Sequence, residues 1–258
     1  MTVYFIGAGP GAPDLITVRG AHVLAECQTC LYAGSLVPAE LLDLCPAEAE
    51  LVDTARMPLP DIIDVIVAAH ARGHDVARLH SGDLAIYSAL SEQQRELTAR
   101  GIDHQIVPGV PAFAAAAAAL DTELTVPGVG QSLLITRVST LSTDMPPGED
   151  LATLAATGVT LALHLAAHRA EEIVAALTPH YGRDCPTATV AFASRANEQI
   201  VRCPLHRLPE ALDAADIRRT AVIFVGRVLD PAGSAATDSY LYSHARMTKL
   251  RNDRGSSS

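Results

Sequence analysis

The feature that most constrains the fold of this chain is a regular alternation of short β-rich runs and helical segments over its first 107 residues. The helical segments carry apolar residues three or four positions apart, as amphipathic helices do. Alternation of this kind predicts parallel strands joined by helical crossovers, and therefore a largely parallel sheet. The predicted strands are 2–6, 29–32, 51–53, 75–80 and 103–107, and the predicted helices are 14–26, 61–71 and 89–100.

A different pattern follows a turn-rich hinge at 107–111, which leads into an alanine-rich helix at 112–120. The segment 124–131 contains Pro127, Gly128 and Gly130, a composition typical of a linker. Beyond it, two predicted strands lie close enough in sequence to form a hairpin, so this half is predicted as a mixed α/β domain. The later strands are expected at 132–137, 159–165, 187–192, 199–203 and 221–225, and helices at 171–177 and 209–214.

These patterns predict two α/β domains and a tail. We expect the domains at 1–115 and 116–232, and a partly disordered tail at 233–258, where small and polar residues predominate. Hydrophobic residues make up 49% of the chain and Trp is absent, a composition that suits close packing of helices on sheets.

Charge and hydropathy exclude two classes of partner. The net charge of -10 argues against general nucleic-acid binding, which needs a basic face. The longest apolar run, 112–120, has nine residues, whereas a membrane-spanning helix needs about 20. Residues 1–6 run into the first glycine loop without a secretion signal, so we expect a soluble, cytoplasmic protein.

The cysteines are expected to be structural, and His164 and His168 to be structural or pocket-lining. Five cysteines without a secretion signal indicate reduced thiols, and the C-x-x-C formed by Cys27 and Cys30 falls between a helix end and a strand start. His164 and His168 are four apart, but no carboxylate motif lies between them. No metal site is predicted.

A glycine-rich loop at 7–11 follows the first predicted strand. With Ala12 it fits the loose G-x-G-x-x-G/A form of a dinucleotide-binding loop. Pro10 and Pro13 interrupt the junction that should present free N–H groups, and no acidic residue near Tyr32 is available for a ribose. No Gly-Lys-Ser/Thr sequence occurs, so a P-loop is absent. A role as a sharp turn, without any ligand, stays open.

Five separated blocks, 4–20, 78–88, 107–112, 186–199 and 220–226, together resemble the tetrapyrrole (corrin/porphyrin) methylase family, in the family's own order. The third block departs from the family pattern, because Pro111 replaces the usual small hydroxyl residue. The resemblance covers residues 2 to about 230. It implies two α/β domains with an active-site trough between them, a homodimer, S-adenosyl-L-methionine as methyl donor and a tetrapyrrole substrate.

Within the family, residues 31–37 resemble the branch that methylates C11 of precorrin-4, and residues 239–246 do so more weakly. Porphyrin-making members usually carry a Tyr-Asp pair here, whereas Ala33 follows Tyr32 in this chain. An acid/base role for that Asp is therefore not carried over, and the catalytic residue stays unknown. The open alternatives are methylation of cobalt-precorrin-4, precorrin-3 or uroporphyrinogen III, and a non-catalytic tetrapyrrole-binding module.

The resemblance also implies donor contacts. Gly82 would let backbone approach the donor, and Asp83 would offer a carboxylate to its ammonium or a hydroxyl. The alternative role for Asp83 is a helix N-cap. Leu165 stands where relatives often have Met. The implied donor-binding residues are Pro10, Gly82, Asp83, Ile86, Pro111, Ala112, Leu165, Ala193, Thr220 and Ala221.

The acceptor would carry acetate and propionate arms, which arginine binds through two parallel hydrogen bonds. Arg56 and Arg137 are the predicted substrate-binding arginines, since both lie near motif loops. Methyl transfer from an activated sulfonium needs alignment and exclusion of water more than a strong base. The absence of a Ser/His/Asp or paired-carboxylate pattern in the sequence agrees with that chemistry.

Overall fold

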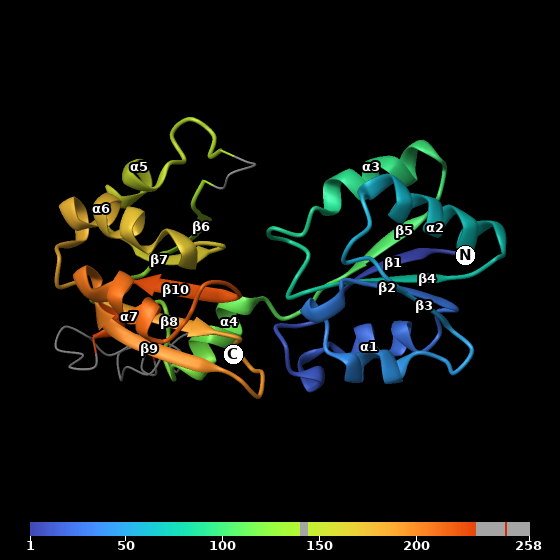
Figure 1. Cartoon of the computed structure of the whole chain (residues 1–258), viewed down its shortest axis with the longest axis horizontal. Coiled ribbons are helices and arrows are strands. Elements are labelled where there is room, and N and C mark those ends of the chain that lie inside the picture. Colours follow the sequence, from blue (N-terminus) through green and yellow to red (C-terminus); the bar gives the residue numbers. More distant parts are fainter. Residues whose placement is uncertain (140–143, 231–245, 247–258) are drawn as a thin grey trace, which may run out of the picture. The chain divides into compact units, whose positions relative to one another are not determined.

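The computed structural model describes residues 1–139, 144–230 and 246 (Figure 1). The chain forms two compact units, each described here by itself. The first contains Met1–Ala116 and Phe192–Glu198, and the second contains Ala117–Ala191 and the described residues from Gln199 onward. Apart from Arg246, the tail predicted at 233–258 lies outside the described residues.

The first unit contains a five-stranded sheet whose paired strands all run parallel, as the alternation of strands and helices predicts. The strand order is β3-β2-β4-β1-β5, which places β1 between β4 and β5. The strands are β1 (Val3–Gly7), β2 (Thr29–Tyr32), β3 (Glu50–Asp53), β4 (Val76–His80) and β5 (His104–Val107).

Helices cover both faces of this sheet (Figure 1). On one face, α2 (Leu59–Ala71) and α3 (Leu90–Ala99) pack isoleucine and leucine side chains against Phe5. On the other face, α1 (Val18–Leu24) packs against Ile6. The strand β1 is consequently buried on both faces, as expected of a central strand in a parallel sheet.

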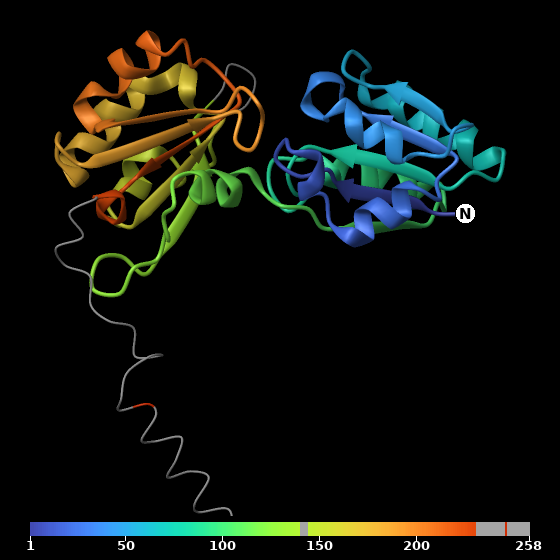
Figure 2. The ribbon, with the colours of Figure 1, turned by 90° about the horizontal axis from the view of Figure 1, so that it is seen from below.

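The second unit contains a five-stranded mixed sheet in the order β6-β7-β10-β8-β9 (Figure 2). The β6–β7 pair is parallel and the other pairs are antiparallel, so the predicted mixed sheet is confirmed. The predicted hairpin is the β8–β9 pair. The strands are β6 (Leu133–Arg137), β7 (Thr160–His164), β8 (Pro186–Ala191), β9 (Gln199–Pro204) and β10 (Ala221–Val225), and the helices are α5 (Leu151–Ala155), α6 (Ala170–Tyr181) and α7 (Leu208–Ala214). The helix α4 (Ala112–Ala119) begins in the first unit, whose first stretch ends at Ala116, and ends in the second.

Three local expectations were wrong. The first helix starts at Val18, not at residue 14, because the Thr17 hydroxyl accepts the Gly20 N–H at 3.1 Å and caps it there. The segment 124–131 is no linker, because a β-bridge between Val126 and Gly130 folds it inside the second unit. The five-residue α5 was not predicted.

None of the helices in the described part of the chain combines the length and the apolar character that a bilayer crossing requires.

Candidate functional site

Three loops meet at the carboxyl ends of β1, β4 and β5. A Cβ atom on Gly7 would lie 2.5 Å from the Gly109 nitrogen, and one on Gly109 would lie 2.3 Å from the Gly82 oxygen. No side chain fits at these distances, so only glycine allows the loops to approach. The Gly82 N–H also donates to the Gly9 oxygen at 2.7 Å. In open α/β sheets, ligands bind at this edge of the strands.

The Asp83 carboxylate connects two of these loops through hydrogen bonds. Its Oδ1 accepts the Ala85 N–H at 2.8 Å and its Oδ2 accepts the Gly109 N–H at 2.7 Å. The N-cap interpretation is wrong, because α3 begins at Leu90 and no side chain caps it. Asp83 is partly exposed, and each carboxylate oxygen has a further lone pair for a ligand.

The loop that contains Asp83 approaches the start of α4. A Cβ on Gly82 would lie 3.7 Å from the Ala112 nitrogen and 3.9 Å from the Pro111 Cα. Four of the predicted donor-binding residues therefore lie together. Ile86 belongs to the same loop, where Tyr87 and Ala89 adopt left-handed φ values of 53° and 52°. Left-handed backbone at non-glycine residues costs free energy and gathers at functional loops.

A segment distant in sequence completes the first unit beside the glycine-rich loop. The Ala12 N–H donates to the Ser194 hydroxyl at 2.9 Å, and the Ser194 N–H donates to Glu198 Oε2 at 2.6 Å. A Cβ on Gly11 would lie 3.1 Å from the Ala193 oxygen. The Ala12 N–H is thus already paired, and α1 starts only at Val18, so no helix N-terminus is available here for a pyrophosphate. This geometry contradicts the dinucleotide alternative.

The remaining predicted donor contacts lie in the second unit. Leu165 directly follows β7, and Ala221 opens β10 directly after Thr220. In the register of these strands, Val222 pairs with His164, so Leu165 and Ala221 lie at the same end of the sheet. Leu165 and Thr220 both have a φ of 53°, and Leu165 is 56% exposed. A strained, exposed leucine contributes little to the core, which favours a role in binding.

The two predicted substrate-binding arginines lie in different units. Arg56 is exposed, three residues beyond β3. Arg137 ends β6 and donates from Nη1 to the Val138 oxygen at 3.0 Å and from Nη2 to the Asp144 oxygen at 3.2 Å. Arg137 is therefore held by its own loop.

Two histidines and two of the cysteines are buried with shifted pKa values, namely His80, His164, Cys27 and Cys30. Burial lowers the pKa of His164 to about 4, and burial with the nearby Arg78 charge lowers the pKa of His80 to about 3. Burial raises the pKa of the Cys27 thiol to about 12, and the hydrogen bond that the Cys30 thiol donates to Cys45, followed by burial, raises the pKa of Cys30. Thiols held protonated in this way are poor nucleophiles, as expected of structural cysteines. Within the described residues, no group of three His, Cys, Asp or Glu side chains is arranged to hold a metal.

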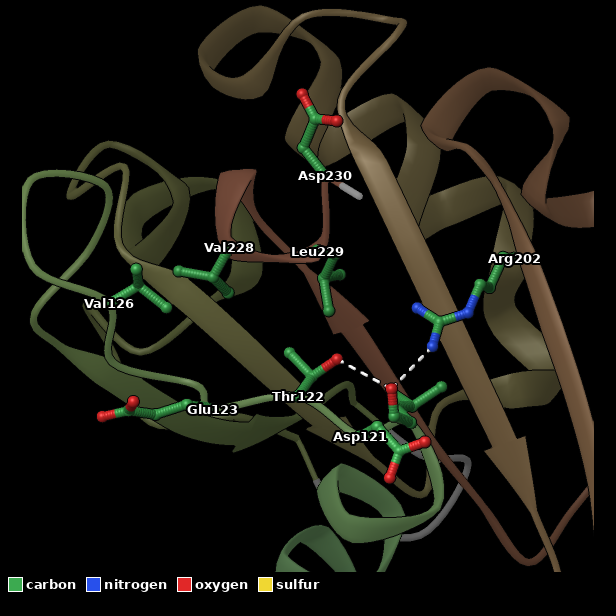
Figure 3. A pocket seen from close by; sticks show the side chains of 9 residues that line it. Asp121, Thr122, Glu123, Val126, Arg202, Val228, Leu229 and Asp230 are labelled. Carbon is green, nitrogen blue, oxygen red and sulfur yellow. Dashed lines mark hydrogen bonds between the residues drawn. The ribbon is translucent and has the colours of Figure 1, made fainter. Parts of the chain in front are cut away.

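The second unit also contains a cavity of about 490 Å³ (Figure 3). Its polar wall centres on the Leu120 oxygen, which accepts hydrogen bonds from Thr122 Oγ1 at 3.0 Å and Arg202 Nη2 at 2.8 Å. None of the predicted site residues lines it. Val228 and Leu229 place it beyond the carboxyl end of β10, whereas Thr220 and Ala221 lie at the amino end.

Comparison with known proteins decides the family. Residues 2–209 match the family described as Tetrapyrrole (Corrin/Porphyrin) Methylases. The chain belongs to this family. The precorrin-4 C(11)-methyltransferase of Rhodococcus erythropolis is 57% identical over 246 residues, which cover 95% of this chain and 98% of that relative.

Solved structures of other tetrapyrrole methylases agree. A cobalamin biosynthetic enzyme, cobalt precorrin-4 methyltransferase, matches with a TM-score of 0.86 and 37% identity, over 89% of this chain and 96% of that one. Uroporphyrin-III C-methyl transferase from Thermus thermophilus, complexed with S-adenyl homocysteine, matches with a TM-score of 0.73 and 28% identity, over 89% and 93% of the two chains. The resemblance drawn from the five sequence blocks and the predicted fold class are thereby confirmed.

Two residues that organise the candidate site of this tetrapyrrole methylase in its first unit were not identified from the sequence. Ser194 and Glu198 were not singled out, although they organise the segment that contacts the glycine-rich loop. The only available signal was their position inside the fourth sequence block. The hydrogen bond between Ala12 and Ser194 joins residues 182 positions apart, a separation that no local pattern reveals.

Proposed function

We propose that this chain transfers a methyl group from S-adenosyl-L-methionine to C11 of precorrin-4, giving precorrin-5 in cobalamin biosynthesis. The observation that carries the proposal is the 57% identity to a precorrin-4 C(11)-methyltransferase over almost its whole length. Relatives named for the cobalt-bearing substrate are more distant, at 42% and 38% identity. This difference favours the metal-free substrate.

In this proposal, the donor supplies a sulfonium-activated methyl group, and the chain supplies its binding site. The edge formed by Gly7, Gly82 and Gly109 fits such a ligand, because backbone is presented there without intervening side chains. The Asp83 carboxylate is proposed to accept hydrogen bonds from the donor's ammonium or a hydroxyl. Pro10, Ile86, Pro111, Ala112 and Ala193 are proposed as further donor contacts in the first unit, and Leu165, Thr220 and Ala221 in the second.

The acceptor is proposed to be held through its carboxylate arms by Arg56 and Arg137, whose planar guanidinium groups suit carboxylates. No general base is assigned, because the lowered pKa values of the buried His80 and His164 make them weak bases and the Asp of the Tyr-Asp pair is Ala33 in this chain. We also propose, from the family resemblance, that the protein is a cytoplasmic homodimer.

The experiment that tests this function is a turnover assay with methyl-labelled S-adenosyl-L-methionine. Precorrin-4, cobalt-precorrin-4 and uroporphyrinogen III are offered separately, and the product is analysed by mass spectrometry and NMR. We expect label at C11 of precorrin-4 together with release of S-adenosylhomocysteine. Label at another carbon, or preference for another acceptor, would assign the chain to a different branch. Ligand binding without release of S-adenosylhomocysteine would indicate a non-catalytic module.

A further inference from the structure

One cationic side chain of the first unit is buried without an acidic partner. Arg78 lies in the middle of β4 and is 6% exposed. No Asp or Glu of the described segments forms an ion pair with it. Burial lowers the pKa of Arg78 to about 10, which leaves the guanidinium charged at neutral pH. Burying an unpaired charge costs free energy, so stability alone does not explain this residue.

The Arg78 guanidinium donates to two neutral side chains, one directly after β3 and the other in α3. Its Nη1 donates to the Thr54 hydroxyl at 2.8 Å, and its Nε donates to Gln93 Oε1 at 3.2 Å. Thr54 and Gln93 are 5% and 4% exposed, so water does not readily replace either bond. A rigid planar fork reaches both acceptors at once, which a lysine ammonium does not.

Thr54 and Gln93 each form a second hydrogen bond that leads to a different loop. The Thr54 hydroxyl gives its single proton to the Tyr32 oxygen at 2.9 Å, and Tyr32 is followed by the acceptor loop, defined here as residues 33–37. The Gln93 amide donates to the Ala89 oxygen at 3.2 Å. Ala89, with its left-handed φ of 52°, ends the donor loop, defined here as residues 81–89.

The donor loop contains Gly82, Asp83 and Ile86, and the acceptor loop lies in the segment that resembles the C11-methylating branch. We propose that Arg78 is a positioning residue that fixes these two loops with respect to each other, so that one buried guanidinium sets both donor affinity and acceptor affinity. The inference rests on the proposed function, because it assigns one loop to each substrate.

Two nearly isosteric substitutions separate the branches of this network. Gln93→Leu removes the link from Arg78 to the donor loop. Thr54→Val removes the link from Arg78 to the acceptor loop, while the Thr54 backbone N–H still donates to the Tyr32 oxygen at 2.8 Å. Gln93→Leu is expected to raise the dissociation constant of S-adenosylhomocysteine about tenfold, the effect of one lost hydrogen bond to a charged group, and to leave the KM for precorrin-4 unchanged. Thr54→Val is expected to do the reverse. Arg78→Lys keeps the charge and is expected to raise both constants.

The matched control is Thr29→Val. Thr29 is another buried threonine of the first unit. Its hydroxyl forms a hydrogen bond with His74 Nδ1 at 2.9 Å at the amino end of β2, away from both loops. This change is expected to lower the melting temperature as much as Thr54→Val does, without altering either constant. Calorimetry gives donor affinity, and initial rates at saturating donor give the KM for precorrin-4.

The outcomes distinguish a failure of the positioning role of Arg78 from a failure of the proposed function. If the wild-type protein neither binds S-adenosylhomocysteine nor methylates precorrin-4, the proposed function is contradicted. A wild-type protein that does both, with Thr54→Val and Gln93→Leu raising the same constant or neither, would overturn only the positioning role. If Arg78→Lys does not fold, the two single-branch variants still decide the question.

Discussion

The two sheets differ in what lies closest together at their loop ends, although Tyr87 and Ala89 of the first unit share the left-handed backbone of Leu165 and Thr220 in the second. In the first unit, the loops after β1, β4 and β5 approach through Gly7, Gly82 and Gly109, so bare backbone forms the surface. In the second unit, Leu165 and Thr220 keep their side chains in backbone conformations that glycine usually occupies. The first arrangement excludes side chains to bring loops together, and the second accepts about 1–2 kcal/mol of backbone strain per residue to place a side chain.

This difference shows where substitution should be intolerable and where it should only alter binding. At the glycine contacts, an added methyl group meets backbone that has no room to move. At Leu165, removal of the side chain relieves strain and takes away little buried surface, because the side chain is 56% exposed. The predictions below test that contrast, in decreasing order of expected effect.

The largest effect is expected for Gly109→Ala. The new Cβ would lie 2.3 Å from the Gly82 oxygen, so β1, β4 and β5 would have to separate at their ends. We expect a loss of about 3 kcal/mol or more in the free energy of unfolding, measured by urea denaturation. Gly101→Ala is the control, because its φ of 67° is unfavourable but no atom lies within 4 Å. It should cost only about 1 kcal/mol, and equal losses for the two variants would contradict the steric account.

Acidification should destabilise both units through one buried histidine each. The pKa values of His80 and His164 are lowered from 6.5 to about 3 and about 4, so the unfolded chain binds protons more readily than the folded one. Stability is therefore complete above pH 6.5 and falls as the pH drops toward those values. At pH 5 the expected loss is about 2 kcal/mol per histidine.

Urea denaturation between pH 7 and pH 5 measures this loss. His80→Phe should remove the contribution of the first unit and His164→Phe that of the second. A pH dependence that both variants retain in full would show that other groups cause it.

A smaller effect, on binding, is expected for Asp83→Ala. The change removes the carboxylate that accepts the Ala85 and Gly109 N–H groups and, in the proposed function, contacts the donor. Affinity for S-adenosylhomocysteine should fall about tenfold by calorimetry. Asp150→Ala provides the control, because Asp150 also accepts a backbone N–H, from Thr153 at 3.0 Å, but caps α5 in the second unit. Equal donor affinity in the wild type and the Asp83 variant would show that Asp83 does not contact the donor.

The smallest effect on stability is expected for Leu165→Gly. Glycine relieves the left-handed φ of 53°, so the melting temperature should stay constant or rise, by the equivalent of about 1 kcal/mol at most, while donor affinity falls. Ile200→Gly is the counterpart, because Ile200 is 44% exposed but lies in the extended strand β9. That variant should lose stability without losing donor affinity. A destabilised Leu165→Gly protein would show that Leu165 serves packing and not binding.

The sequence predicted the strands well because their signals are local. The predicted run 29–32 agrees with β2, and 221–225 agrees with β10. Helix starts were less predictable, since Thr17 rather than Asp14 provides the cap of α1. The short α5 was missed because five residues hold too little periodicity to distinguish a helix from a turn.

The candidate site was predictable in composition but not in connectivity. The motifs named Gly82 and Asp83, yet only the fold shows that Asp83 bonds the Gly109 N–H and that Thr54 and Gln93 share one guanidinium. These contacts depend on strand order, which places β1 between β4 and β5. The composition of 124–131 was misleading for the same reason, because Pro127 and Gly128 belong to a turn inside a unit.

The seven residues Phe192–Glu198 belong to the first unit, although β8 and β9 on either side of them pair in the second. A fragment cut at residue 116 would thus lack the hydroxyl that receives the Ala12 N–H. In a chimera of two tetrapyrrole methylases, residues 1–116 and 192–198 would have to come from the same parent. A single crossover between them would place residues 192–198 of one parent against the glycine-rich loop of the other. For the same reason, recombination during evolution would tend to transmit the two halves as one inherited piece.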